Sequence, residues 1–173
     1  MFWSAFELSP SLKTYRRLVR EADQTGNGDP RREAAFDLLN RALDDARRSG
    51  SDARAEQVAA TIIEVRLFEG DVDAAWRVAT HCGCAQRVWL QLARARERDH
   101  PEDVIPIYER EIELLIDQKK DGAYRGAVKL MSHVQSLQAG LERPGGFDDL
   151  VARVRAVHGR KPNLMRRVAA KGW

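Results

Sequence analysis

The sequence has little of what a disulfide-bonded or membrane-spanning protein needs. Its 173 residues include two cysteines, Cys82 and Cys84, which are two positions apart and would close only a very small loop. Such a pair is a poor crosslink for a fold and favours a reducing compartment. No apolar run approaches the roughly 18 residues of a membrane span, and the N-terminus lacks the basic and apolar segments of a secretory signal. We therefore expect a cytoplasmic protein with no membrane association.

Aromatic residues are also scarce, at 7% of the chain, and β-branched residues rarely occur in runs. This composition argues against a β-sandwich or a barrel, whose strands need such residues in alternating patterns. Ala, Arg, Leu and Glu dominate instead, and they favour helices. Apolar residues recur every three to four positions almost throughout, as they do in amphipathic helices. The sequence therefore predicts an all-α fold, with short connections between antiparallel neighbours.

Helix starts are predicted from residues whose side chains can cap a first turn. Ser9-Pro10 and Asp29-Pro30 each combine a capping residue with a proline suited to the first turn. Asp71 is predicted to cap the helix that follows it. Asp99, with Glu102 three residues later, resembles a capping box. A last short helix is predicted to start at Pro162.

Two segments suggest a structural repeat. Gly70 with Ala75, and Gly122 with Ala127, partly follow the order of glycine turn and small residue found in tetratricopeptide helix pairs. The spacing of the two segments is not a multiple of the roughly 34-residue period, so the repeats would be degenerate. We predict antiparallel helical hairpins stacked as a degenerate tetratricopeptide-like α-solenoid. It would form one domain over residues 1–173, with a compact irregular helical bundle as the alternative.

Short motifs along the chain carry a family resemblance. They are Phe6, Pro10-Ser11-Leu12, Tyr15-Arg16-Arg17-Leu18, Leu67, Glu69-Gly70-Asp71-Val72, Ala74-Ala75-Trp76, Gly83-Cys84, Trp89-Leu90, Leu92-Ala93, His100-Pro101-Glu102-Asp103, Pro106, Tyr108, Ala123-Tyr124, Ala127-Val128-Lys129-Leu130 and Asn163-Leu164-Met165. Together they resemble the helical C-terminal region of bacterial SWIM zinc-finger-containing proteins and their uncharacterised relatives. The resemblance implies a tetratricopeptide-type scaffold and, more weakly, a binding role. Cys82-Gly83-Cys84 matches only the first half of that family's zinc module, and no Cys-x-His follows. Zinc and DNA binding by the module are therefore not carried over.

The charges are unevenly distributed. The segment 150–173 contains seven cations and no acidic residue, while the whole chain has a net charge of +3, so the remainder is mildly acidic. Such a segment can bind an acidic partner or nucleic acid, or it can simply be solvated. It has no interleaved aromatic residues, so it offers no stacking platform for single strands. The candidate partner-binding residues are Arg153, Arg155, Arg160, Lys161, Arg166 and Arg167.

The cysteine pair and its neighbouring histidine include residue types that bind metal ions. His81, Cys82 and Cys84 are possible zinc ligands, and His100 could supply a fourth. The three clustered residues lie on one short turn, which is cramped for tetrahedral coordination. We expect no metal and no cofactor, although the sequence alone does not decide whether the cluster binds one.

Catalytic arrangements are equally weak. The cysteines could act as nucleophiles with a histidine, but His81, His100, His133 and His158 lie in no recognised signature. The carboxylate pairs Glu109 with Glu113 and Asp148 with Asp149 are interpreted as parts of solvated helix faces. No phosphate-binding glycine loop is present, since Gly26-Asn27-Gly28 lacks the lysine and the preceding strand. The chain is predicted not to be an enzyme.

These observations favour a non-enzymatic protein-interaction scaffold that binds a protein or peptide partner on its helical surface. The alternative is a nucleic-acid-associated accessory protein that uses the basic C-terminal segment 150–173. Trp76 and Trp89 are predicted to lie in the core, and Trp3 and Trp173 to pack against the end helices. The identity of the partner, the pathway, the binding face and the oligomeric state stay open.

Overall fold

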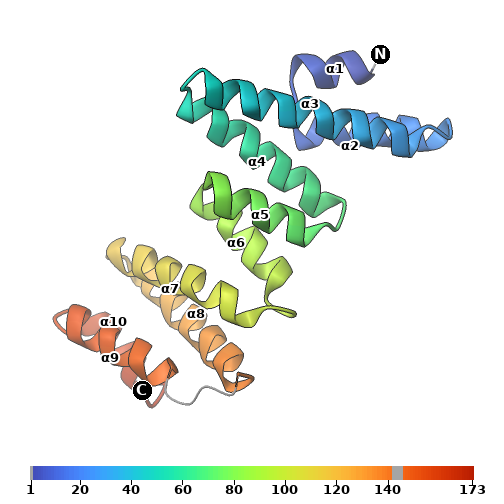
Figure 1. The fold of residues 1–173 in the computed structure, drawn as a ribbon. Helices are drawn as coiled ribbons and strands as arrows, with labels where there is room; N and C mark the ends of the chain where they lie inside the picture. The colour runs from blue at the N-terminus through green and yellow to red at the C-terminus, as the bar shows by residue number, and fades with distance from the viewer. Residues whose placement is uncertain (1, 142–145) are drawn as a thin grey trace. The chain divides into compact units, whose positions relative to one another are not determined.

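The computed structural model describes residues 2–141 and 146–173, which form ten helices and no strand (Figure 1). The prediction of an all-α fold is thus confirmed. The helices are α1 (Phe2–Leu8), α2 (Leu12–Gln24), α3 (Gly28–Arg48), α4 (Asp52–Phe68), α5 (Val72–Cys82), α6 (Gln86–Arg96), α7 (Pro101–Asp117), α8 (Asp121–Ala139), α9 (Gly146–His158) and α10 (Pro162–Ala169).

The chain divides into two compact units, Met1–Leu92 and Ala93–Trp173. Each is described by itself below. The interpretation of residues 1–173 as one domain stays a prediction. None of the helices in the described part of the chain is long and apolar enough to cross a membrane.

In the first unit, α1, α2, α3 and α4 each pack against the next helix in the chain, and α2 also contacts α4 (Figure 1). The aromatic ring of Tyr15 is central to this packing. Its centroid lies 6.0 Å from that of Phe6, 6.1 Å from that of Phe36 and 6.2 Å from that of Phe68. One side chain thereby joins α1, α2, α3 and α4. Other buried members of the same core are Leu18, Val19, Ala35, Leu39, Leu43, Ala59, Ile62 and Val65.

A second core of the first unit joins α4, α5 and α6. Trp76 and Trp89 pack against it edge to face, with ring centroids 5.5 Å apart. Both rings are half-buried, so they border the core that they were predicted to enter. The buried members are Ile63, Ala75, Ala79, Val88 and Leu92. The alanines of α5 allow this helix to approach its neighbours closely.

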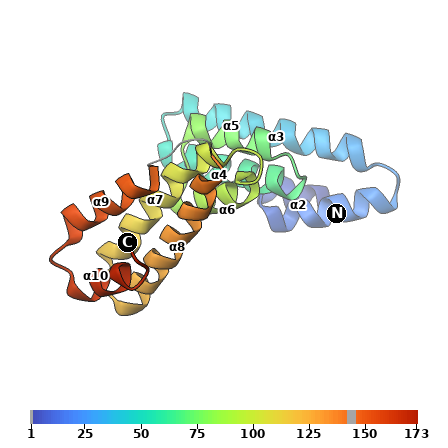
Figure 2. The same cartoon turned by 90° about the horizontal axis from the view of Figure 1, so that it is seen from below.

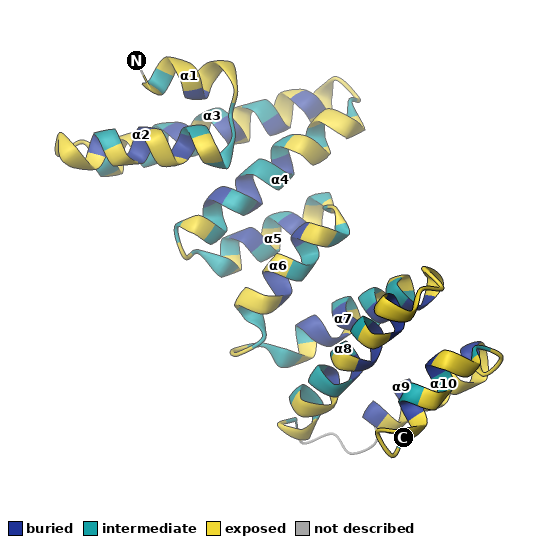
Figure 3. Cartoon of the chain, turned by 180° about the vertical axis from the view of Figure 1, so that it is seen from behind, coloured by how far each residue is buried: buried dark blue, intermediate teal, exposed yellow. Residues whose placement is uncertain are grey.

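In the second unit, α7 packs along α8, while α9 and α10 both pack against α8 and against each other (Figure 2). The inner faces of these helices are buried and their outer faces exposed (Figure 3). Trp173 packs its ring against Phe147 with centroids 4.9 Å apart, which confirms that this terminal tryptophan contacts an end helix. The apolar spacing of Phe147, Leu150 and Val154 continues to Val157 and predicts a buried side chain there, but Val157 is 71% exposed.

The first helix boundary differs from the prediction. The segment up to Leu8 forms α1, and Ser9 still belongs to its last turn, since its N–H donates to the carbonyl of Ala5. Ser11, not Ser9, caps α2. Its hydroxyl accepts from the N–H of Thr14, whose hydroxyl accepts in return from the N–H of Ser11. This reciprocal pair forms a capping box with threonine in place of the usual acid or amide.

Two further caps were wrongly predicted and one was right. Helix α3 begins at Gly28, so Asp29 lies inside its first turn. His100 occupies the N-cap of α7 in place of Asp99, because Pro101 suits the first helical position and sets the start one residue later. Asp71 does cap α5 and accepts from the N–H of Ala74 at 3.1 Å. The run Arg143-Pro144-Gly145-Gly146 predicts a break in the chain; residues 143–145 lie outside the described residues, and α9 begins at Gly146.

Candidate partner-binding surfaces

The predicted partner-binding residues lie on α9, α10 and the turn between them. Arg153 and Arg155 belong to α9, and Arg166 and Arg167 to α10. Arg160 and Lys161 lie on the connection, where Lys161 is the N-cap of α10. The structure therefore gathers all six in one part of the second unit, although they do not share one exposed face.

Half of these cations are paired with acidic residues of the same unit. Arg153 donates to Glu109 at 2.6 Å, Lys161 lies 3.6 Å from Asp117, and Arg167 donates to Asp121 at 2.7 Å. The acids recur every four residues, and Glu113 completes the series by binding His158 at 2.6 Å. Residues four apart in one helix share a face, so Glu109, Glu113 and Asp117 line one face of α7, and Asp121 begins α8. We call these four pairs the charge ladder.

His158 is the buried member of the charge ladder, with 6% of its surface exposed. Its Nε2 lies 2.6 Å from a carboxylate oxygen of Glu113, and its Nδ1 lies 2.9 Å from Nζ of Lys161. A lysine ammonium can only donate, so Nδ1 accepts and Nε2 carries the proton that Glu113 receives. This arrangement fixes one imidazole tautomer and positions Lys161. It makes His158 a structural residue in a hydrogen-bonded chain.

The remaining predicted cations are less engaged. Arg155 donates to the backbone carbonyl of Trp173. Arg160 and Arg166 are exposed, and neither forms an ion pair within residues 2–141 and 146–173. The carboxylates Glu109 and Glu113 were interpreted as a solvated face. In the structure they bind α9, because their four-residue spacing matches cations that lie about 45 positions later in the chain.

The cysteine cluster is split between two environments. Cys82 ends α5 and borders the core around Tyr15, while Cys84 follows Gly83 and borders the core around Ile63. Arg47 lies 2.9 Å from the sulfur of Cys82 through Nη2. Burial, then the nearby Cys82 and Glu56, raise the pKa of Cys84 to about 11. Within the described ranges, no three His, Cys, Asp or Glu side chains are arranged to hold a metal ion.

Glu97, Tyr108 and His133 form another polar cluster in the second unit. Oε2 of Glu97 accepts from the Tyr108 hydroxyl at 2.5 Å and lies 2.8 Å from Nε2 of His133. Burial alone would raise the pKa of Glu97, but these two hydrogen bonds and the charges of His133 and Arg94 lower it overall. The ring of His133 also packs edge to face on Tyr108. The cluster ties the end of α6 to α7 and α8.

Glu69 has the equivalent role in the first unit. It accepts from the Tyr15 hydroxyl at 2.9 Å through one oxygen and from Nε of Arg32 at 3.2 Å through the other. Arg32 also binds both carboxylate oxygens of Asp23, at 2.8 and 3.0 Å. Burial and the bond to Glu69 raise the pKa of Tyr15. This network joins α2, α3 and the end of α4.

A groove of about 590 Å³ opens in the first unit between the α1–α2 connection, α3 and α4. Leu8 lies at its edge and is 87% exposed. The other apolar lining residues are Pro10, Leu38, Leu39, Ala42 and Val58, and the polar ones are Glu7, Arg41, Asp45, Arg54, Gln57 and Thr61. A concave apolar surface with a polar border is typical of binding sites.

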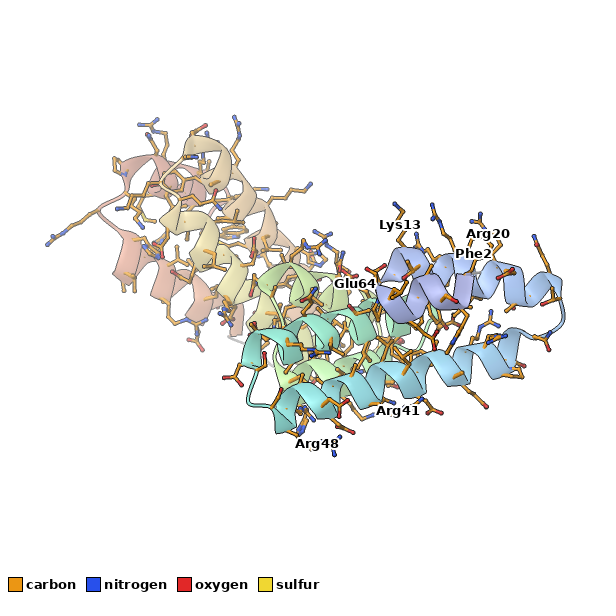
Figure 4. The ribbon with its side chains drawn as sticks, turned by 90° about the horizontal axis from the view of Figure 1, so that it is seen from above. Phe2, Lys13, Arg20, Arg41, Arg48 and Glu64 are labelled. Carbon is orange, nitrogen blue, oxygen red and sulfur yellow. The ribbon has the colours of Figure 1, made fainter. Side chains whose placement is uncertain are left out.

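Helix α2 carries a basic surface that the sequence analysis did not single out. Lys13, Arg16, Arg17 and Arg20 are all exposed, and a helix turns about 100° per residue, so they fall within an arc of about 100°. The labelled Lys13 and Arg20 extend from the same side of α2 (Figure 4). The signal was present, since residues 12–20 contain four cations and no acid. The C-terminal segment 150–173 was the stronger candidate in the sequence because its run of cations without acids is longer.

Comparisons with protein-family models, curated proteins and solved structures found no match to this chain.

Proposed function

We propose that this chain is a cytoplasmic, non-enzymatic protein-interaction scaffold, and that its helices stack as hairpins of a degenerate tetratricopeptide-like solenoid. The packing of α1 to α5 in chain order in the first unit, and of α7 to α10 in the second, supports such stacking. The likeness of the sequence to the helical region of SWIM zinc-finger-containing proteins supports it as well. The polar clusters around Glu69, Glu97 and His158 link helices to one another.

The groove beside Leu8 carries this proposal. An apolar side chain that is 87% exposed at the edge of a 590 Å³ groove gains from burial by a partner. Arg41 and Arg54 lie on the same lining and form no ion pair within the described chain, whereas Asp45 is bound by Arg48. The occupant we propose is a peptide segment of a partner protein. It would place an apolar side chain against Leu8 and an acidic one near Arg54.

The second candidate function is nucleic-acid binding by the C-terminal segment. Fewer cations are available for it than the sequence indicates. Three of the six predicted residues are bound to Glu109, Asp117 and Asp121. Arg160 and Arg166 remain, together with the exposed Lys171. This alternative predicts steep weakening with salt, and loss of binding when Arg160, Lys161, Arg166 and Arg167 are changed to alanine.

A photo-crosslinking amino acid at position 61 tests the groove directly. Thr61 lines the groove on α4, while the exposed Thr80 on α5 provides a control position outside it. In cells of the native host, we expect a crosslinked partner protein at position 61 and not at position 80. Mass spectrometry identifies the adduct.

Two matched substitutions complete the test. Leu8→Asp should abolish the adduct at position 61, whereas Val157→Asp, at another exposed apolar side chain, should leave it unchanged. An adduct that forms equally at position 80, or that survives Leu8→Asp, would contradict the proposal. So would the absence of any protein adduct at position 61.

A further inference from the structure

The four cations of α2 have no acidic partners in the described chain, whereas several other cations of the first unit do. Elsewhere in the first unit Arg32 binds Asp23 and Glu69, and Arg66 binds Asp71. Arg48 and Arg87 are paired as well, with Asp45 and Glu64. Lys13, Arg16, Arg17 and Arg20 form no ion pair within residues 2–141 and 146–173. Arg41 of α3 and Arg54 of α4 form no ion pair in the described chain either, whereas the four cations of α2 share one face of a single helix.

The face lies directly opposite the buried side of α2. Tyr15, Leu18, Val19 and Ala22 fix the orientation of the helix in the core, so the cations must point into solvent. The acids of the helix do not neutralise them, because Asp23 is held by Arg32 and Glu21 makes no ion pair in the described chain. Lys13 and Arg20 are about two helical turns apart, or roughly 10 Å. The result is a compact row of unneutralised positive charge.

An exposed aromatic ring adjoins this row. Phe68, at the end of α4, is 43% exposed, and the guanidinium carbon of Arg16 lies 4.7 Å above the centre of its ring. Tyr15 supports the ring from the core side at a centroid distance of 6.2 Å. A guanidinium on a half-exposed ring is a flat, cationic platform at the surface. Nucleic acid bases stack on aromatic side chains and on arginine planes in proteins that bind single strands.

We propose that the α2 face, defined as Lys13, Arg16, Arg17, Arg20 and Phe68, binds single-stranded nucleic acid. The cations contact successive phosphates, and an unstacked base packs on the Arg16–Phe68 pair. An acidic peptide would use the cations but would have no need of the exposed ring. This site is separate from the groove beside Leu8, so either proposal can fail without the other.

Fluorescence anisotropy with a labelled mixed-sequence single strand of about 20 nucleotides tests the proposal, since single-strand sites span about 4–16 nucleotides. Four phosphate contacts predict a slope of about −3 for the logarithm of the binding constant against the logarithm of salt concentration. The triple change Lys13→Gln, Arg17→Gln and Arg20→Gln should flatten the slope to about −1. The matched triple Arg41→Gln, Arg48→Gln and Arg54→Gln removes the same charge from α3 and α4. It should leave the slope unchanged.

The stacking step needs its own variants. Phe68→Leu keeps an apolar side chain against Tyr15 and should weaken binding of the single strand by about tenfold, with the slope unchanged. Arg16→Lys keeps the charge, removes the guanidinium plane and should act in the same direction. Arg16→Lys replaces Phe68→Leu as the test of stacking if Phe68→Leu lowers the thermal midpoint of unfolding. Circular dichroism of each variant establishes that the helices are intact.

Other polyanions are measured as competing ligands in the same assay. A duplex of the same length, poly-glutamate and phosphatidylserine vesicles should each bind more weakly than the single strand and should not respond to Phe68→Leu. Binding of any of these as tight as that of the single strand would overturn the proposal. So would a single strand that does not bind, or one whose binding is indifferent to both the triple change and the stacking variants.

Discussion

Arg167 of α10 holds Asp121, the first residue of α8, by contacting both carboxylate oxygens with one guanidinium nitrogen. Nη2 of Arg167 lies 2.7 Å from Oδ1 and 2.8 Å from Oδ2 of Asp121. The carboxylate also suits the positive end of the α8 dipole. This pair is the last of the charge ladder. It joins α10 to α8, the helix against which α10 makes most of its packing.

The pair makes a testable distinction between two adjacent arginines. Arg167→Gln should lower the urea midpoint of unfolding, because it removes the hydrogen bonds to Asp121 and leaves that carboxylate with the longer 3.5 Å contact to Arg125. Arg166→Gln should leave the midpoint unchanged, because Arg166 is exposed and forms no ion pair in the described chain. Equilibrium unfolding at low salt measures both. Equal midpoints for the two variants would contradict the role assigned to Arg167.

Acid should weaken the same contact. The hydrogen bond from Arg167 lowers the pKa of Asp121, so its stabilising effect is complete above the unfolded-state pKa of about 4 and is lost as the pH falls through the folded-state value. The difference in urea midpoint between the wild type and Asp121→Asn should therefore be constant from pH 7 to about pH 5 and should shrink below about pH 4. A difference in urea midpoint that grows on acidification would contradict the stabilising effect assigned to the ionised carboxylate of Asp121.

The hydrogen bonds of His158 predict a single neutral tautomer. At pH 8, nitrogen chemical shifts should show a protonated Nε2 and an unprotonated Nδ1, since Lys161 donates to Nδ1. Lys161→Met should allow Nδ1 to lose this donor and shift its resonance. Detection of the Nδ1–H tautomer in the wild-type protein would refute the assigned chain of hydrogen bonds.

The Tyr15 hydroxyl is predicted to stabilise the first unit by its bond to Glu69. Tyr15→Phe should reduce the free energy of unfolding by about 1 kcal/mol, which is typical for loss of one hydrogen bond. Tyr124→Phe provides the control, because the structure shows no hydrogen bond from that hydroxyl in the described residues. Chemical denaturation of both variants measures the contrast. A similar loss in Tyr124→Phe would indicate that the effect is not due to Glu69.

Cys84 should alkylate slowly at neutral pH. Its pKa of about 11, raised mainly by burial, leaves little of the reactive thiolate at pH 8. In a Cys82→Ser variant, the iodoacetamide rate at Cys84 should rise about tenfold per pH unit from pH 8 to 10 and level off near pH 11. A plateau below pH 9 would contradict the effect of burial.

Some features of the fold could be predicted because they depend on neighbours in the chain. The apolar spacing of Tyr15, Leu18 and Val19 predicts the buried side of α2, where all three are buried, and the prediction of Asp71 as a cap is confirmed. Ser9 was a plausible cap by residue type, but α1 extends through the segment before it and Ser11 begins α2. Val157 continues the apolar spacing of α9, yet no other helix covers it.

The candidate surfaces were harder to predict, since exposure of a charge depends on what folds against it. Arg153 and Arg167 looked available in the sequence, but Glu109 and Asp121 bind them. The cations of α2 were visible as residues, although only the folded unit shows that they lack acidic partners.

Local chemistry therefore determined the helices of this protein: apolar residues every three to four positions, interrupted by glycine and proline, permit little else. The tertiary structure decided which charges are free, because Glu109, Glu113 and Asp117 meet their partners only when residues more than 40 positions apart pack together. A side chain's residue type is fixed along the chain, whereas its ion pairs and its exposure are properties of the packed helices.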